Sequence, residues 1–189
     1  MARLFAQKGV TENAQALGVH AAQLFRITSM DYLRLYPHVP EALAALRERG
    51  FRLWLLTNAQ KIFTAYELRY LGLDDKFDGI YFSSGYRCRK PDGRFFQALI
   101  RQRKLTPSTC LMIGNDRQTD IAGAADAGFA TLYMHTALTP WDQAAADPAL
   151  SPEHARAEQR HYEFEGSDWQ RLTWLLCGPC LKNYSKRNK

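Results

Sequence analysis

The chain has 189 residues, of which 46% are hydrophobic and 23% are charged. These values are typical of a globular protein with one domain of ordinary size and a small appendage. No apolar run approaches the ~18 residues needed to span a bilayer, and four scattered cysteines exclude a disulfide-rich scaffold.

The N-terminal segment, residues 1 to about 36, is rich in Ala, Leu and Gln, which predicts one or two helices, the clearer one over 13–33. Pro40 suits the first turn of a following helix over 41–49, and Gly50 suits its C-terminal cap. We divide the chain into a helical segment (1–36), a main domain (37–176) and a basic tail (177–189).

Short apolar runs alternate with helical patterns from residue 51 onward, and several of the helices end at a glycine. This alternation predicts an α/β fold with a doubly wound parallel sheet. The region 137–160 is interpreted as a loop or loose helix. The predicted strands cover 51–56, 79–82, 109–113, 130–134 and, at an edge, 161–165, and the predicted helices cover 61–71, 92–103, 119–127 and 168–176.

Two predicted strands lead into polar or basic residues at their carboxyl ends, where ligands of parallel sheets bind. Thr57 and Asn58 offer a hydroxyl and an amide that could hold a phosphoryl oxygen, although both are also ordinary helix caps. Lys90 precedes Pro91, whose fixed backbone would make the path of the ammonium rigid. Such a lysine could neutralise a phosphoryl group; the alternative is a basic surface loop.

A third strand end is acidic. The strand over 109–113 opens through Gly114 into Asn115 and Asp116, and Asp120 follows at the start of a helix. Closely spaced oxygen donors suit Mg²⁺, which takes a couple of carboxylates plus water and phosphate oxygens. The alternatives are charge stabilisation of a helix N-terminus by Asp120 and a turn role for Asp116.

The order and spacing of these three motifs resemble the haloacid dehalogenase (HAD) superfamily. Its strand ending in Thr or Ser is matched by Thr57, its Lys-Pro by Lys90-Pro91, and its acidic loop by the segment from Gly114 to Asp120. Asn115 stands where many members have their first acid, with Asp116 beside it. The resemblance covers about 36–136 well and the helical N-terminus, which looks like a small cap remnant, more loosely.

The resemblance implies a Rossmann-like core and hydrolysis of small phosphate monoesters with Mg²⁺ as cofactor. It places Thr57 and Lys90 in catalysis. The implied phosphate-binding residues are Thr57, Asn58 and Lys90, and the implied metal-binding residues are Asp116, Asp120 and Asn115.

The family's nucleophile does not occur here. Members attack phosphorus with the first Asp of an Asp-x-Asp motif and form an aspartyl-phosphate, yet these 189 residues contain no Asp-x-Asp. We therefore expect this chain alone to be inactive or very weak. The strand that carries the motif lies centrally in the family, between the strands ending at Thr57 and Ile113.

Without that central strand, its two neighbours would lie roughly 9–10 Å apart, twice the normal spacing. Each facing backbone group left unpaired would cost about 1–3 kcal/mol, unless the gap closes or another segment fills it. The leading interpretation is a truncated chain or a gene start placed too far downstream. The alternatives are a degenerate relative that binds a phosphate ligand or a partner, and a strand supplied by another chain.

A competing interpretation comes from Cys177-Gly-Pro-Cys180, the Cys-x-x-Cys of thioredoxin-like proteins or half of a metal site. Here the motif follows a helix, whereas the redox motif follows a strand and opens a helix.

The basic tail is interpreted as a solvated terminus. Because the N-terminus lacks a signal-peptide pattern, we expect a cytoplasmic protein with no nucleic-acid or membrane partner.

Overall fold

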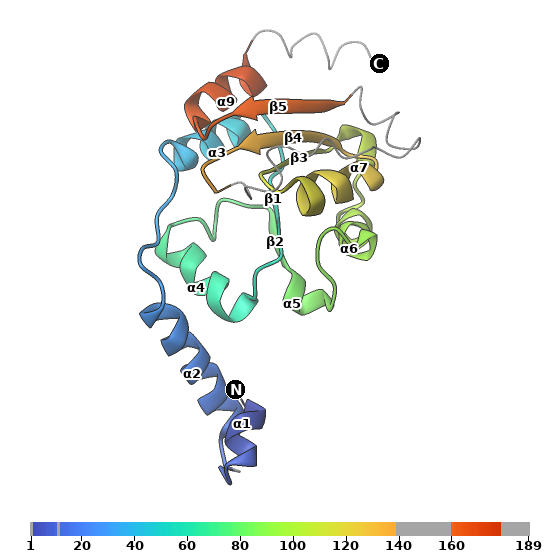
Figure 1. Ribbon diagram of the computed structural model, residues 1–189. Coiled ribbons are helices and arrows are strands. Elements are labelled where there is room, and N and C mark those ends of the chain that lie inside the picture. Colours follow the sequence, from blue (N-terminus) through green and yellow to red (C-terminus); the bar gives the residue numbers. More distant parts are fainter. Residues whose placement is uncertain (1, 11, 139–159, 179–189) are drawn as a thin grey trace.

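The computed structural model describes residues 2–10, 12–138 and 160–178, and its strands form two parallel sheets (Figure 1). The predicted α/β class, with parallel strands separated along the chain by helices, is confirmed. The first sheet pairs β1 (Trp54–Thr57) with β2 (Gly79–Phe82). The second has the order β3 (Leu111–Gly114), β4 (Ala130–His135), β5 (His161–Glu165).

The helices flank these strands, and those predicted over 41–49, 61–71, 92–103 and 168–176 lie within one or two residues of their predicted bounds. The Cys180 thiol, the tail from 179 and most of the predicted loop over 137–160 lie outside the described residues. None of the helices in the described part of the chain is long and apolar enough to cross a membrane. The helices are α1 (Ala2–Gln7), α2 (Ala14–Thr28), α3 (Val39–Glu48), α4 (Lys61–Tyr70), α5 (Ser83–Tyr86), α6 (Gly93–Arg103), α7 (Gly123–Asp126) and α9 (Trp169–Cys177).

Two predicted elements extend well beyond the observed ones. The helix predicted to reach residue 33 ends at Thr28. The strand predicted from residue 51 begins at Trp54, since the carboxylate of Asp78 accepts the N–H of Leu53 at 2.7 Å.

The N-terminal helices project away from the sheets, as Figure 1 shows. Helix α2 is anchored to α4 by the ion pair of Arg26 with Glu67, 2.7 Å between Nε and Oε1. The apolar side chains of Leu24 and Phe25 on α2 stay largely exposed. The proposed division of the chain at residue 36 remains a prediction.

The buried core lies where helices cover the strands. Phe95 and Phe96 of α6 are fully buried beside Tyr81 of β2, and Leu172 of α9 packs on Leu132 of β4. Strand β4, with a neighbour on each side, is buried at every position but its last. Strands β1 and β3 each have one neighbour among the described residues and are mostly half-buried.

Candidate functional site

Thr57 and Asn58 stand at the carboxyl end of β1, and Asn58 fixes the loop that carries Lys90. The Asn58 Oδ1 accepts the Lys90 N–H at 2.7 Å, and its Nδ2 donates to the Lys90 carbonyl at 3.0 Å. The Thr57 hydroxyl accepts the N–H of Ala59 at 3.1 Å. The chain direction after β1 is thus set by side chains, and Asn58 joins two strand-end segments that are 32 residues apart in sequence.

Lys90 points from this loop to Asp120. Its Nζ lies 2.6 Å from Asp120 Oδ1, and only 9% and 10% of the two side chains are exposed. The other carboxylate oxygen, Oδ2, accepts the N–H groups of Asn115 and Asp116 at 3.2 and 3.3 Å. Paired in this way, two charges can be buried without leaving either one uncompensated.

The acidic loop after β3 is held by its own carboxylates. The Asp116 Oδ1 accepts the N–H groups of Gln118 and Thr119 at 3.0 and 2.8 Å. This cap starts a π-helical turn, Arg117–Ala122, two residues before the helix predicted at 119. A side chain on Gly114 would overlap the Asp120 carboxylate, so only glycine lets the loop close on it.

The three motifs meet at one cavity of about 760 Å³, which lies between β1 and β3. Thr57, Lys90, Asn115 and Asp120 line it. Asn58 and Asp116 are not among its lining residues. Asn58 is hydrogen-bonded to Lys90, and Asp116 to Asp120, and both of these partners line the cavity. The strand ends therefore come together, while the assigned roles of these residues remain predictions.

Two further residues of the cavity were not predicted. Thr136, just after β4, lines it, and its hydroxyl accepts from the Asn115 amide at 3.3 Å. The same strand-end rule that singled out Thr57 would have found it.

Cys110 also lines the cavity. Burial raises the pKa of its thiol, against smaller opposing effects of Thr109 and nearby arginines. Burial therefore favours the protonated form of the thiol, which is the less nucleophilic form.

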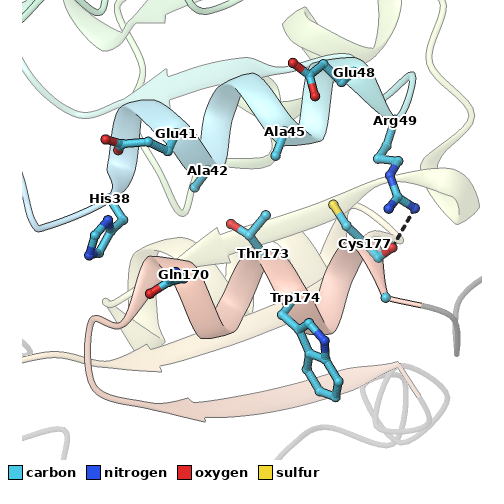
Figure 2. A pocket seen from close by; sticks show the side chains of 11 residues that line it. His38, Glu41, Ala42, Ala45, Glu48, Arg49, Gln170, Thr173, Trp174 and Cys177 are labelled. Carbon is cyan, nitrogen blue, oxygen red and sulfur yellow. Dashed lines mark hydrogen bonds between the residues drawn. The ribbon is translucent and has the colours of Figure 1, made fainter.

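A second cavity of about 620 Å³ lies between α3 and α9 and contains none of the predicted phosphate or metal residues (Figure 2). There the Arg49 guanidinium donates to the carbonyl of Cys177 at 2.7 Å. Cys177 is the last residue of α9, and its thiol is free. The Cys-x-x-Cys motif thus follows a helix, in contrast to the arrangement of thioredoxin-like sites.

The family assignment follows from a sequence comparison over most of these elements. The family model described as haloacid dehalogenase-like hydrolase matches residues 2–128. The chain belongs to this hydrolase family. The matched stretch includes β1, β2, β3 and every residue assigned here to phosphate or metal binding.

Several curated relatives of this HAD-like chain are named phosphatases. It is 31% identical over 107 residues to the glyceraldehyde 3-phosphate phosphatase of Methanothermobacter thermautotrophicus, covering 57% of this chain and 47% of the relative. It is 33% identical over 123 residues to the phosphoserine phosphatase of Thermus thermophilus, covering 64% and 47%. The chain thus spans about half the length of these relatives.

Solved structures show the same fold. An uncharacterized protein from Listeria monocytogenes serotype 4b superposes with a TM-score of 0.63 at 21% identity, covering 83% of this chain and 86% of that one. A HAD phosphatase from Thermococcus onnurineus superposes with a TM-score of 0.51 at 20% identity, covering 69% and 73%. At these sequence identities the structural similarity shows a shared fold alone.

Proposed function

We propose that this chain forms the phosphate- and magnesium-binding part of a hydrolase of small phosphate monoesters. The observation that carries the proposal is the buried pair of Lys90 and Asp120 at a cavity that Thr57 also lines. Relatives named phosphoserine phosphatase, glyceraldehyde 3-phosphate phosphatase and phosphoglycolate phosphatase support this substrate class.

In the proposed site, Thr57 and Lys90 bind the phosphoryl group. The Thr57 hydroxyl can donate to a phosphoryl oxygen while it accepts the Ala59 N–H, since a hydroxyl does both. The Lys90 ammonium has three donors, so one can stay on Asp120 while the others face the ligand. Asn58 acts chiefly by holding the Lys90 backbone, and direct contact of its amide with phosphate remains part of the proposal.

The acidic loop fits Mg²⁺ as a site that the substrate completes. Asp116, Asp120 and the Asn115 carbonyl group offer hard oxygen donors at one strand end, and Mg²⁺ commonly binds one or two carboxylates together with phosphate oxygens. No group of three or more acidic, histidine or cysteine side chains in the described part of the chain forms a metal site. When bound, Mg²⁺ would neutralise charge on the phosphoryl oxygens.

The covalent step we propose needs a carboxylate that these 189 residues do not place in an Asp-x-Asp motif. In that step a carboxylate oxygen bonds to phosphorus, the alcohol leaves with a proton, and water then releases inorganic phosphate. The chain alone is accordingly expected to hydrolyse a generic aryl phosphate very weakly or not at all. A non-catalytic protein that binds a phosphate ligand or a partner is the second candidate.

The test is calorimetric titration of inorganic phosphate into the 189-residue chain with Mg²⁺ present. We expect binding that Thr57→Val weakens roughly tenfold, the value of one good hydrogen bond to a charged ligand. Thr173→Val, which removes a hydroxyl bonded to the Trp169 carbonyl on α9, is the matched control and should change nothing. Absence of phosphate binding, or equal loss in both variants, would refute the site.

A further inference from the structure

One face of strands β4 and β5 carries a cluster of polar side chains, which do not line the cavity of the proposed site. Successive side chains of a strand point to opposite faces of its sheet, so Tyr133 and His135 share this face with their partners in register, Glu163 and Glu165. Tyr133 is fully buried, so another part of the chain covers the face. We call this cluster the β4–β5 polar face, and its members are Thr131, Tyr133, His135, His161, Glu163 and Glu165.

Arg117 of the acidic loop contacts this face. Its guanidinium carbon lies 4.9 Å from the ring centre of Tyr133, and its Nη2 lies 3.5 Å from Oε1 of Glu163. A planar guanidinium can stack on a ring and form an ion pair at the same time. Arg117 begins the π-helical turn that Asp116 caps. Its side chain therefore ties the backbone beside a proposed Mg²⁺ ligand to β4 and β5.

Glu163 is held in turn by two histidines. The Nε2 atom of His135 lies 3.2 Å from Glu163 Oε2, and that of His161 lies 3.5 Å from Oε1. The other ring nitrogen of His161 lies 2.7 Å from the hydroxyl of the buried Thr131. Although 49% of the Glu163 side chain is exposed, these contacts restrict its rotation. A restricted carboxylate loses less entropy on pairing with Arg117, and that loss is one reason why most exposed ion pairs are weak.

We propose that Glu163 is a positioning residue, which acts through Arg117 to hold the acidic loop in the conformation that binds Mg²⁺. Because Mg²⁺ requires nearly ideal octahedral geometry, a loop that is already ordered binds it at a smaller entropic cost. Asp116 directly precedes Arg117, and Asp120 lies in the same turn, so loosening of Arg117 affects both proposed ligands. For Mg²⁺ the inference rests on the proposed function, whereas the hold on the loop can be measured without metal.

The first test is hydrogen exchange in the metal-free chain. Glu163→Gln removes the charge that pairs with Arg117 and keeps the size of the side chain. We expect the amides of Gln118 and Thr119, which donate to Asp116, to exchange about two- to fivefold faster, the range expected for one partly exposed ion pair.

The matched control for this exchange experiment is Glu165→Gln. It removes a neighbouring carboxylate of the same face, which is 82% exposed and lies 3.9 Å from His135. The loop amides should exchange in this variant at the rate of the unaltered chain. Equal rates in Glu163→Gln and the unaltered chain would overturn the inference.

The second test is calorimetric titration of Mg²⁺ with inorganic phosphate present. Glu163→Gln should weaken Mg²⁺ binding about two- to fivefold, and Glu165→Gln should not. Phosphate affinity measured without Mg²⁺ should stay unchanged in both variants. Unchanged Mg²⁺ affinity in Glu163→Gln, or a parallel loss of phosphate affinity, which indicates general loosening, would overturn the inference.

A double variant tests whether Glu163 acts through Arg117. In the Arg117→Gln background, the further change Glu163→Gln should alter neither loop exchange nor Mg²⁺ affinity, because the partner is already gone. Losses that add in the double variant would contradict this role. If the unaltered chain binds no Mg²⁺, the proposed function fails, and exchange in the metal-free chain still decides whether Glu163 holds the loop.

Discussion

The ammonium of Lys90 and the carboxylate of Asp120 form a buried ion pair 2.6 Å apart between the loops that follow β2 and β3. Removing one partner leaves the other charge buried and unpaired, so Lys90→Met should lower the free energy of unfolding by about 3–5 kcal/mol. Urea denaturation measures this loss.

The double variant Lys90→Met, Asp120→Asn tests whether this loss of stability comes from the unpaired buried charge. Asn at 120 keeps an acceptor for the N–H groups of Asn115 and Asp116, and no buried charge remains. We expect the double variant to be more stable than Lys90→Met alone. A double variant that loses the sum of both single effects would show that the pair is not coupled.

Asn58 is expected to act as a structural clamp. Asn58→Ala removes both bonds to the Lys90 backbone and should cost about 1–3 kcal/mol in urea denaturation. The control is Gln15→Ala, at an exposed position on α2, which should stay within about 0.5 kcal/mol. Equal effects of the two substitutions would argue against the clamp.

Gly114 is expected to tolerate no side chain. In Gly114→Ala the new methyl group would overlap Asp120, and overpacking of this kind costs about 1–3 kcal/mol. Gly93→Ala at the first residue of α6, where a methyl group meets open space, is the control and should be neutral or slightly stabilising. Thermal denaturation of the two variants separates these outcomes.

Asp116 allows the metal role to be separated from the structural role. Asp116→Asn keeps the oxygen that accepts the Gln118 and Thr119 N–H groups but removes the charge. Stability should change little, while calorimetry should show Mg²⁺ affinity in the presence of phosphate falling about tenfold or more. Asp168→Asn, the matching cap of α9, should leave Mg²⁺ binding intact; an unchanged affinity in Asp116→Asn would exclude this ligand.

Glu163 on β5 should make stability depend on pH. Burial alone would raise its pKa, but hydrogen bonds from His135 and His161 outweigh it and hold the pKa below the ordinary 4.5. A carboxyl whose pKa is lower when folded stabilises the fold above pH 4.5, and this contribution is lost as pH falls through the folded value.

The effect should be small, because the Glu163 side chain is about half exposed and solvent screens its ion pairs. Urea midpoints measured between pH 3 and pH 6 should therefore fall slightly less steeply in Glu163→Gln than in the unaltered chain. Glu12→Gln, at an exposed N-terminal position, should reproduce the unaltered profile. A Glu163→Gln profile identical to that of the unaltered chain would show that the histidine contacts do not matter.

Much of the fold could be predicted because the signals are local. The strands predicted over 79–82 and 161–165 matched the observed bounds of β2 and β5, since strand length and flanking turn residues are read within a few positions. A bound was wrong where a side chain competed for the backbone, as the carboxylate of Asp78 does for the Leu53 N–H before β1. Such competition depends on geometry that residue type alone does not determine.

The amino-acid sequence by itself determined the order of strands and helices, the three polar strand ends and the absence of an Asp-x-Asp motif, because each is a property of neighbouring residues. Tertiary structure decided that Asn58 holds Lys90, that Gly114 makes room for Asp120, and that Thr57, Lys90 and Asp120 line one cavity. These relationships join segments far apart along the chain, and only the packed backbone sets the distances between them.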